Sequence, residues 1–420
     1  MTAETASATA ALPTAITTPA TTSTEASHPL RSIPFRLWLT GGTISLLGDQ
    51  FYLVALPWLV LQQTGSAVAM GGILMAGAVP RAVLMLFGGV LSDRVSSRKI
   101  MMATAAARAL CVAAIGALAW LHIVQVWQLY ALAFAFGVAD AFAAPAQSAY
   151  LPALLEPEQL VAASSISQGT AQLASIAGPA PAGLLINVLG VASGFFADAL
   201  SFLAIIAALC TLPDPPKTQL AHQGIWTAMG EAVRYVSSDV PLRSLMLLAS
   251  CLNFCITGPV SVGLAYVAKQ HFDSPVAYGV LVSAVAAGGL IGAVLAGVWQ
   301  IRKRGAMILL ASALLGLCLG AIGLLAGLWS IAAVLLVMGV TAGVVNIHIG
   351  AWIMQRIEAA MRGRVASVLM LACVGLMPVS LAVTGLLVAW NLKATFLLAG
   401  AAMLAASAAA GLQKPVRQIA

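Results

Sequence analysis

Charged residues are scarce in this chain of 420 residues: Asp, Glu, Lys and Arg make up 8% of it, against 61% for hydrophobic residues. Soluble domains carry about 25% charged and about 45–50% apolar residues. The composition therefore excludes a soluble globular protein. A helix that crosses bilayer hydrocarbon needs roughly 20 apolar residues, so about twelve crossings would use about 250 residues and account for the hydrophobic fraction. We expect an all-α polytopic membrane protein.

Residue patterns that carry chemistry in soluble proteins are equally scarce. The chain has no G-x-x-x-x-G-K-[ST] phosphate-binding motif, no C-x-x-C spacing among its six cysteines, and five histidines that stand far apart. Its basic residues lie between apolar runs, which argues against the basic patch that binds nucleic acid. We expect no metal, no cofactor, no nucleic-acid partner and no catalytic constellation, so the protein is not expected to be an enzyme.

Apolar runs of helical length, separated by polar or Pro/Gly breaks, follow one another from residue 37 to residue 412. One connection, at 213–240, is long. Within it Trp226, Met229, Val233 and Val236 recur at helical spacing, which favours a short amphipathic helix on the membrane surface or a simple linker helix. We predict a disordered cytoplasmic tail at 1–34, six-helix halves at 35–212 and 241–412, a cytoplasmic loop at 213–240 and a cytoplasmic tail at 413–420.

The distribution of basic residues predicts the orientation. With the N-terminus inside, sixteen of the twenty Lys and Arg residues fall on the cytoplasmic side of the predicted helices. Lys and Arg near helix ends favour that side. We therefore expect a multi-pass protein of the cell membrane, surrounded by lipid, with both termini in the cytoplasm.

An internal repeat relates the two halves. When the chain is shifted by 208 residues, identical residues coincide without a gap around the second and eighth predicted helices; they include Ser66 with Ser274, Ala69 with Ala277, Gly71 with Gly279, Gly89 with Gly297, and Arg94 with Arg302. Repeated helical halves are typical of transporters. The repeat predicts two parallel six-helix halves around a central cavity, with alternating access by rocking of one half against the other.

A charged turn follows the second predicted helix. Gly89 precedes Asp93, Arg94, Arg98 and Lys99 within eleven residues. A carboxylate among three cations could pair with neighbouring charges and helix ends in one conformation and release them in another, so we predict a conformational latch. A purely topological role would explain the cations but not the carboxylate.

In this order the turn resembles G-x-L-x-D-R-x-G-R-K, the signature of the major facilitator superfamily, although Ser96 stands where the family has Gly. The second half keeps Gly297 and Arg302 but has Ile301 at the Asp position, which predicts a weaker latch. Further segments, among them Gly48-Asp49-Gln50 and Leu56-Pro57-Trp58, resemble the drug and siderophore exporters of that superfamily. The resemblance implies the superfamily fold and a monomeric exporter.

The fifth predicted helix, at 160–188, contains Gly178, Pro179 and Gly183. These residues resemble the G-P-x-x-x-G element of exporters in the superfamily. Proline removes a backbone donor and bends a helix, whereas glycine permits close packing. A helix kink without meaning for the direction of transport is the alternative interpretation.

Ionisable side chains inside predicted helices are the main site candidates. Asp49 and Asp140 lie within the first and fourth helices, and Arg81 and Arg108 lie within the second and third. Such residues are costly to insert and usually have a partner or a function, of which proton transfer is one. We predict that Asp49 or Asp140 couples protons or recognises a cation. A structural ion pair to Arg81 or Arg108 is the alternative.

The repeat offset places His348 at the position equivalent to Asp140, so the two side chains could face one cavity; a packed core histidine is the alternative. The amides of Gln168, Gln172, Asn253 and Asn346 are weaker candidates for lining that cavity.

Together these features predict a secondary active transporter that exports a small organic compound, such as a drug, a macrolide-like natural product or a siderophore, by proton antiport. A nutrient importer, a uniporter and a membrane scaffold are the alternatives. The charge of the substrate stays open, because the acidic candidates suit a cation and the arginines suit an anion.

Overall fold

The computed structural model describes residues 28–214, 225–298, 303–358 and 361–417, and at 86–94, 225–228 and 414 it describes the backbone alone. Every regular element in these ranges is helical, without a strand. Twelve described segments are long and apolar enough to cross a membrane. The predicted all-α polytopic fold is confirmed.

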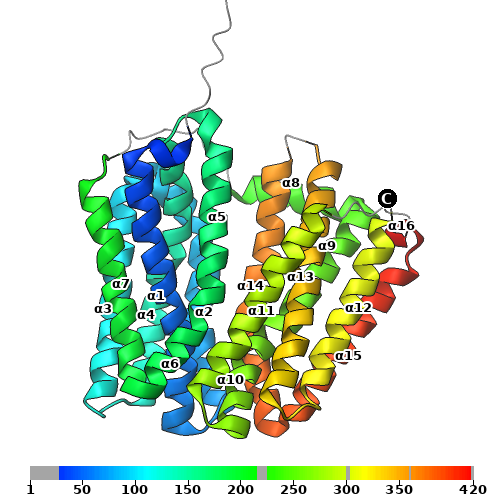
Figure 1. The fold of residues 1–420 in the computed structure, drawn as a ribbon. Helices are drawn as coiled ribbons and strands as arrows, with labels where there is room; N and C mark the ends of the chain where they lie inside the picture. Colours follow the sequence, from blue (N-terminus) through cyan, green and yellow to red (C-terminus); the bar gives the residue numbers. More distant parts are fainter. Residues whose placement is uncertain (1–27, 215–224, 299–302, 359–360, 418–420) are drawn as a thin grey trace, which may run out of the picture.

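The helices form two groups that stand side by side (Figure 1). The first group consists of α1 (Ile33–Thr64), α2 (Ala67–Arg94), α3 (Ser97–Trp120), α4 (Val126–Tyr150), α5 (Leu160–Ala177), α6 (Pro179–Leu189) and α7 (Val191–Thr211). The second consists of α9 (Val240–Gly258), α10 (Leu264–Val267), α11 (Pro275–Val298), α12 (Arg304–Ile322), α13 (Leu328–Arg356), α14 (Arg362–Trp390) and α15 (Leu392–Leu412). The helix α16 (Lys414–Arg417) follows at the end of the described chain.

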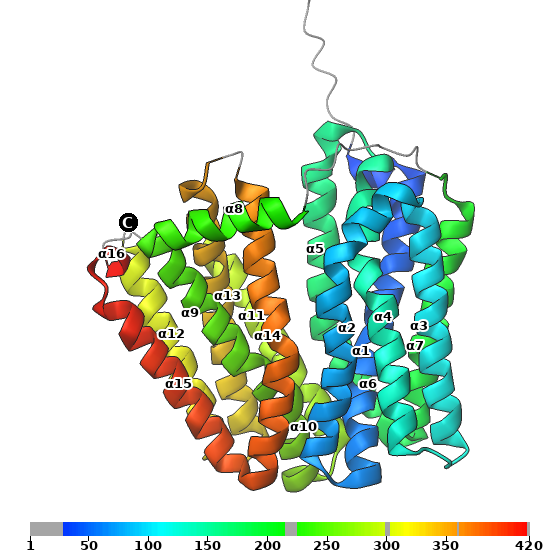
Figure 2. The same cartoon turned by 180° about the vertical axis from the view of Figure 1, so that it is seen from behind.

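Short helical turns complete the fold, namely η1 (Pro29–Arg31), η2 (Leu151–Ala153), η3 (Pro157–Gln159) and the π-helical η4 (Pro259–Gly263) and η5 (Ala268–Phe272). The beginning of α1, the helix α16 and the connecting helix α8 (Ile225–Ser238) all lie on one face of the molecule (Figures 1 and 2). We call it the terminal face.

Local signals set the ends of the helices. The hydroxyl of Ser32 accepts a hydrogen bond from the backbone N–H of Phe35 and caps α1, which ends at Gly65 with a left-handed φ of 60°. The predicted helix at 160–188 is divided into α5 and α6, because Gly178 and Pro179 interrupt it. The bend expected from this proline is therefore present.

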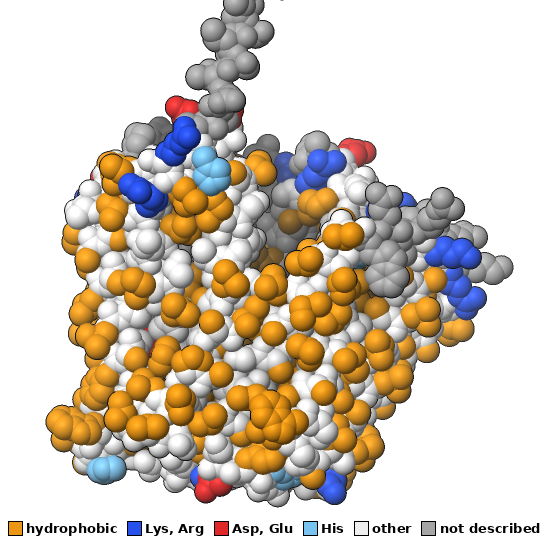
Figure 3. All heavy atoms as spheres, viewed as in Figure 1, with side chains coloured by type: hydrophobic (Ala, Val, Ile, Leu, Met, Phe, Trp, Pro, Cys, Tyr) orange, Lys and Arg blue, Asp and Glu red, His pale blue; other side chains and the backbone are white. Residues whose placement is uncertain are grey.

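The lateral surface of both groups is apolar. Side chains such as Leu110, Trp329 and Leu386 are exposed, and hydrophobic side chains cover the flank of the molecule in Figure 3. Lys, Arg and acidic side chains gather instead toward the two ends of that view. An apolar band between polar ends is the pattern of a protein immersed in lipid.

The halves touch tightly at the end opposite the terminal face. A Cβ atom at Gly183 of α6 would lie 2.3 Å from the carbonyl oxygen of Pro275, and one at Gly279 of α11 would lie 2.2 Å from that of Pro179. A second glycine contact joins α2 to α14, where a Cβ atom at Gly71 would lie 2.6 Å from the carbonyl oxygen of Leu381. Gly71 and Gly279 are equivalent in the repeat, so both copies use this glycine to bring the halves together. We call these contacts the glycine seam.

At the terminal face, in contrast, the surface is hollowed between the two groups (Figure 3). The connecting helix α8 contacts the second group there through Glu231, which pairs with Arg364. Directly after α8, Asp239 at the start of α9 pairs with Arg356 at 2.7 Å. A short helix in this loop was predicted, and α8 confirms it.

Candidate functional site

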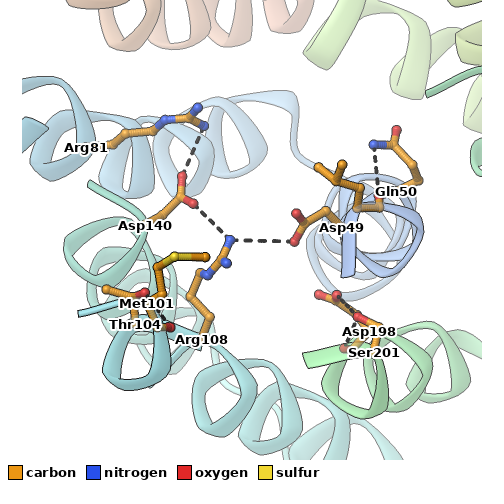
Figure 4. Close-up of polar contacts among 10 residues, drawn as sticks. Asp49, Gln50, Arg81, Met101, Thr104, Arg108, Asp140, Asp198 and Ser201 are labelled. Carbon is orange, nitrogen blue, oxygen red and sulfur yellow. Dashed lines mark hydrogen bonds and ion pairs between the residues drawn. The ribbon is translucent and has the colours of Figure 1, made fainter. Parts of the chain in front are cut away.

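Four ionisable side chains from four helices meet inside the first group. Asp49 of α1, Arg81 of α2, Arg108 of α3 and Asp140 of α4 lie in the middle turns of their helices and point toward one another (Figure 4). Arg81 and Arg108 lie 3.2 Å and 3.1 Å from the carboxylate of Asp140, and Arg108 lies 3.8 Å from that of Asp49. We call these four residues the charge cluster. The sequence indicated each member, and the structure supplies their pairing.

The two carboxylates of the charge cluster are held unequally. Asp140 contacts both guanidinium groups, and Arg108 donates a hydrogen bond to it. Asp49 contacts only Arg108, beyond hydrogen-bond distance, and its buried Oδ1 has no hydrogen-bond partner among the described residues. Asp49 is therefore the less strongly held carboxylate, and its side chain is also the more exposed, at 30% against 17%.

Aromatic rings hold the central guanidinium in place. The guanidinium carbon of Arg108 lies 4.6 Å from the ring centre of Phe202 and 6.0 Å from that of Phe136. Contacts between a guanidinium and a ring face are attractive, more so away from water. Tyr52 stacks on Phe136 with ring centres 4.4 Å apart. These aromatic supports were not foreseen, because such rings at helical spacing are also typical of simple core packing.

A third carboxylate lies beside the charge cluster. Asp198 of α7 is completely buried, and the Ser201 hydroxyl donates hydrogen bonds to its backbone oxygen at 2.7 Å and to its Oδ1 at 3.3 Å. Gly48 makes room for this pair, because a Cβ atom there would lie 1.9 Å from the hydroxyl oxygen of Ser201.

A cavity of about 320 Å³ adjoins the charge cluster, and all four charged side chains line it. Its wall also includes residues of the second half: Ser261 of η4, Tyr278 of α11, and Met377 and Leu381 of α14. The charges of the first half therefore face the boundary with the second, beside the glycine seam.

A larger cavity, of about 1170 Å³, lies between α5 and the second group of helices. Its lining includes Gln168, Gln172, Asn253 and Asn346, the four amides expected to line a cavity. Gln172 donates a hydrogen bond across the halves to the backbone oxygen of Ala286, at 2.9 Å. We call this the amide cavity.

His348 does not join Asp140. Its ring is buried and lies 2.9 Å from the backbone oxygen of Val344, and it lines neither the cavity at the charge cluster nor the amide cavity. Asn346 and Gly350 on either side of it do line the amide cavity. At about 100° per residue, position 348 points away from the face that these two share. The structure therefore favours the alternative interpretation of His348 as a packed core histidine, and not the one in which it faces a cavity with Asp140.

The predicted latch is described in part. Gly89, Asp93 and Arg94 belong to the last turns of α2, where only the backbone is described, so their side-chain contacts lie outside the described residues. Arg98 donates hydrogen bonds to the backbone oxygens of Leu209 and Cys210, at 2.6 Å and 3.0 Å. It thus caps the end of α7, a favourable place for a cation.

Lys99, the last residue of the predicted latch, is exposed beside Arg98. Ser96, which stands where the superfamily has Gly, donates a hydrogen bond to Asp214 just beyond α7.

One contact between the halves was missed from sequence. The ammonium group of Lys269 in η5 lies 5.0 Å from the ring centre of Trp58 in α1, and it also pairs with Asp273. Trp58 is fully buried at the end of the molecule where the glycine seam closes. No sequence signal pairs Lys269 with α1.

Comparisons with known proteins agree with this architecture. A family model described as the Major Facilitator Superfamily matches residues 38–380. The chain is 30% identical over 378 residues to the multidrug efflux pump Tap of Mycobacterium tuberculosis, covering 87% of this chain and 89% of the pump. It is 26% identical over 296 residues to macrolide efflux protein A of Streptococcus pyogenes, covering 69% of this chain and 73% of that protein.

Solved structures show the same fold at low sequence identity. The nucleoside transporter NupG superposes with a TM-score of 0.72 at 12% identity, covering 92% of this chain and all of that one. A bacterial homologue of the human lysosomal transporter Spinster, in an inward-facing and unoccupied conformation, superposes with a TM-score of 0.72 at 14% identity, covering 93% of this chain and 98% of that one. The repeat, the twelve spans and the matching family model together show that this chain is a multi-pass membrane protein belonging to the major facilitator superfamily, whose members transport small molecules.

Proposed function

We propose that the protein is a proton-coupled exporter of small organic compounds in the cell membrane. It works as a monomer, with both termini in the cytoplasm, and its halves at 35–212 and 241–412 rock to give alternating access. A proton enters through the charge cluster while the compound leaves. The described hollow on the terminal face then corresponds to a state open to the cytoplasm.

Two observations support export as the direction. Two of the relatives that match more than two thirds of the chain are named as a multidrug efflux pump and a macrolide efflux protein. Gly178, Pro179 and Gly183 resemble the exporter element of the superfamily, and this element forms part of the glycine seam. A change of packing there would open the end of the molecule that is closed in the described state.

The unequal hold on Asp49 and Asp140 is the observation that carries proton coupling. When both carboxylates and both arginines are charged, the charge cluster is neutral, and Arg108 is shared between Asp49 and Asp140. Protonation of Asp49 removes the ionic attraction between Asp49 and Arg108, so the guanidinium of Arg108 then pairs with Asp140 alone. Because the adjoining cavity is walled by both halves, this exchange alters the charge at their boundary. We therefore assign proton binding to Asp49 and a positioning role to Asp140.

The energy available to such a cycle is sufficient for export. One proton that moves through 100 mV supplies about 2.3 kcal/mol, and each unit of pH difference adds about 1.4 kcal/mol. Together they sustain a substrate gradient of one to several decades.

The test uses purified protein in vesicles that contain a pH-sensitive dye. A pH gradient is imposed, and a panel of macrolides, tetracyclines, lipophilic cations, siderophores and uncharged compounds is added to wild type, Asp49→Asn and Asp140→Asn. We expect a substrate-evoked proton flux in wild type that is lost in Asp49→Asn. Transport of labelled substrate without any proton flux in wild type would contradict the proposal.

A further inference from the structure

The amide cavity differs in chemistry from the charge cluster beside it. It takes in residues of α5, α9, α11, α12, α13 and α14, and its described lining contains no Asp, Glu, Lys, Arg or His. That lining contains no Phe, Tyr or Trp either. All four charged members of the charge cluster line the smaller cavity, and the two described linings share no residue.

The polar groups of the amide cavity are mainly side-chain amides whose hydrogen-bond donors and acceptors are largely unused within the described chain. Gln168 and Asn346 have no hydrogen-bond partner among the described residues, whereas Asn253 accepts one hydrogen bond from Thr257 at 3.3 Å. Gln172 donates one amide N–H to the backbone oxygen of Ala286. An amide both donates and accepts hydrogen bonds, so these groups match hydroxyl and carbonyl groups on a ligand.

The wall of the amide cavity formed by α11 and α13 is closely packed. A Cβ atom at Gly339 would lie 2.3 Å from the backbone oxygen of Val285, and one at Gly343 would lie 2.5 Å from that of Gly289. The two helices thus pack backbone against backbone along the cavity, and Leu290, Ile347 and Ile349 give this wall apolar side chains. The described lining offers apolar surface but no aromatic ring on which a planar ligand could stack, so the cavity suits a bulky, non-planar ligand.

A charged ligand would be poorly held in this cavity. Moving a charge out of water is costly unless an opposite charge or a dense set of hydrogen bonds replaces the water. A cation would find neither a carboxylate nor the aromatic face that binds ammonium groups elsewhere. An anion would find no guanidinium or ammonium group among the described lining residues.

We infer that the transported compound is uncharged when bound: a bulky, oxygen-rich, non-planar molecule whose hydroxyl and carbonyl groups are recognised by Gln168, Asn253 and Asn346. This inference rests on the proposed function as an exporter and names its substrate class. The charges that drive transport are then kept apart from the substrate. Exchange of one proton for a neutral compound moves one net charge per cycle.

Binding to purified protein, at one pH and without any gradient, tests the inference. Matched ligand pairs share a scaffold and differ in charge: a neutral macrolactone and its amino-sugar macrolide, and a neutral macrolactone and its sulfate ester. We expect the neutral member of each pair to bind at least about tenfold more tightly, since a desolvated and unpaired charge costs well over 1.4 kcal/mol. Equal or tighter binding of the charged members would overturn the inference, and so would failure of every neutral compound to bind.

A gain of function sharpens the test. Asn346→Asp places a carboxylate in the amide cavity with almost no change of shape, and we expect it to tighten binding of the amino-sugar macrolide relative to the neutral macrolactone. Asn391→Asp is the matched control, because Asn391 caps α15 and lies outside the cavity. If Asn346→Asp leaves the relative affinities unchanged while the protein stays folded, the amide cavity is not the binding site.

The two proposals can fail separately. Binding of neutral ligands does not depend on a proton gradient, so it survives if Asp49 has no role in coupling. A substrate-evoked proton flux with charged compounds alone would leave proton coupling intact and reject the neutral class.

Discussion

The two halves are related by an internal repeat but differ in the chemistry of their interiors. In the first half, five ionisable side chains stand in the interior of described helices, namely Asp49, Arg81, Arg108, Asp140 and Asp198. In the described spans of the second half, Lys, Arg, Asp and Glu lie near helix ends, and the interior is formed by apolar residues, glycine, serine and threonine hydroxyls, amides and the core residue His348. The equivalent halves therefore keep common packing positions and differ in chemistry.

This contrast teaches which features a repeat preserves. Gly71 and Gly279 are equivalent, and both bring the halves into contact, because close approach of backbones requires the absence of a side chain at that place. Asp140 and His348 are equivalent too, yet one belongs to an ion-pair cluster and the other packs in the core. Packing constraints act on both copies alike, whereas a charge needs partners that only one copy supplies.

Removal of the central cation should have the largest effect. Arg108→Gln leaves Asp49 without its ionic partner and Asp140 with Arg81 alone, and breaking such a buried pair typically costs about 3–5 kcal/mol of stability. We expect a lower unfolding free energy in detergent and loss of transport. Arg304→Gln is the control in the second half, since Arg304 bonds Gln355 at an exposed helix end and such changes stay within about 0.5 kcal/mol. Equal effects of the two variants would remove the distinction between the halves.

The second largest effect is expected for substitutions in the glycine seam. Gly183→Ala and Gly279→Ala each place a Cβ atom against a backbone oxygen of the other half, and overpacking of this kind costs about 1–3 kcal/mol. We expect the closed end to open more often. The measurement is labelling of Ser261→Cys by an impermeant thiol reagent from that end, in a chain whose native cysteines are replaced.

Gly42→Ala is the matched control for the seam, because a Cβ atom at Gly42 would meet no atom within 4 Å. Labelling that rises equally in Gly42→Ala would show that general loosening, and not the seam, controls access.

A smaller effect is expected for the contact between Lys269 and Trp58. Lys269→Met removes a cation–π interaction worth about 0.5–1 kcal/mol at an exposed site, so access to Ser261→Cys should rise roughly twofold to fivefold. Lys393→Met, which changes an exposed lysine at the start of α15, should leave labelling unchanged. No difference between the two variants would show that the Trp58 contact does not hold the halves together.

The smallest effect is expected at the connecting helix α8. The pair of Glu231 and Arg364 is partly exposed, and surface ion pairs contribute about 0.2–1 kcal/mol. Glu231→Gln should lower stability within that range and leave transport intact. A loss of transport without a loss of stability would instead make α8 part of the transport cycle.

Much of this architecture follows from the sequence alone. Apolar runs of fixed length predict the twelve spans, since each span is bounded by residues that leave the hydrocarbon. The bend at Gly178 and Pro179 and the amphipathic helix α8 follow from local rules. The interior positions of Asp49, Arg81, Arg108 and Asp140 are also visible in the sequence.

Contacts between helices do not follow in the same way. The sequence left open whether Asp49 pairs with Arg81 or Arg108, because that choice depends on the rotation of four helices about their axes. The orientation of His348, the support of Arg108 by Phe202 and the contact of Lys269 with Trp58 depend on the same rotations. Each of these is a tertiary feature without a local signal.

The most direct test of the central claim compares uphill and exchange transport in Asp49→Asn. In vesicles loaded with an uncharged substrate, exchange of labelled for unlabelled compound needs no net proton movement, whereas accumulation against a gradient does. We predict that Asp49→Asn keeps exchange near the wild-type rate and loses accumulation driven by a pH difference. Accumulation at the wild-type level in Asp49→Asn would contradict the account, because the less strongly held carboxylate would then not carry the proton.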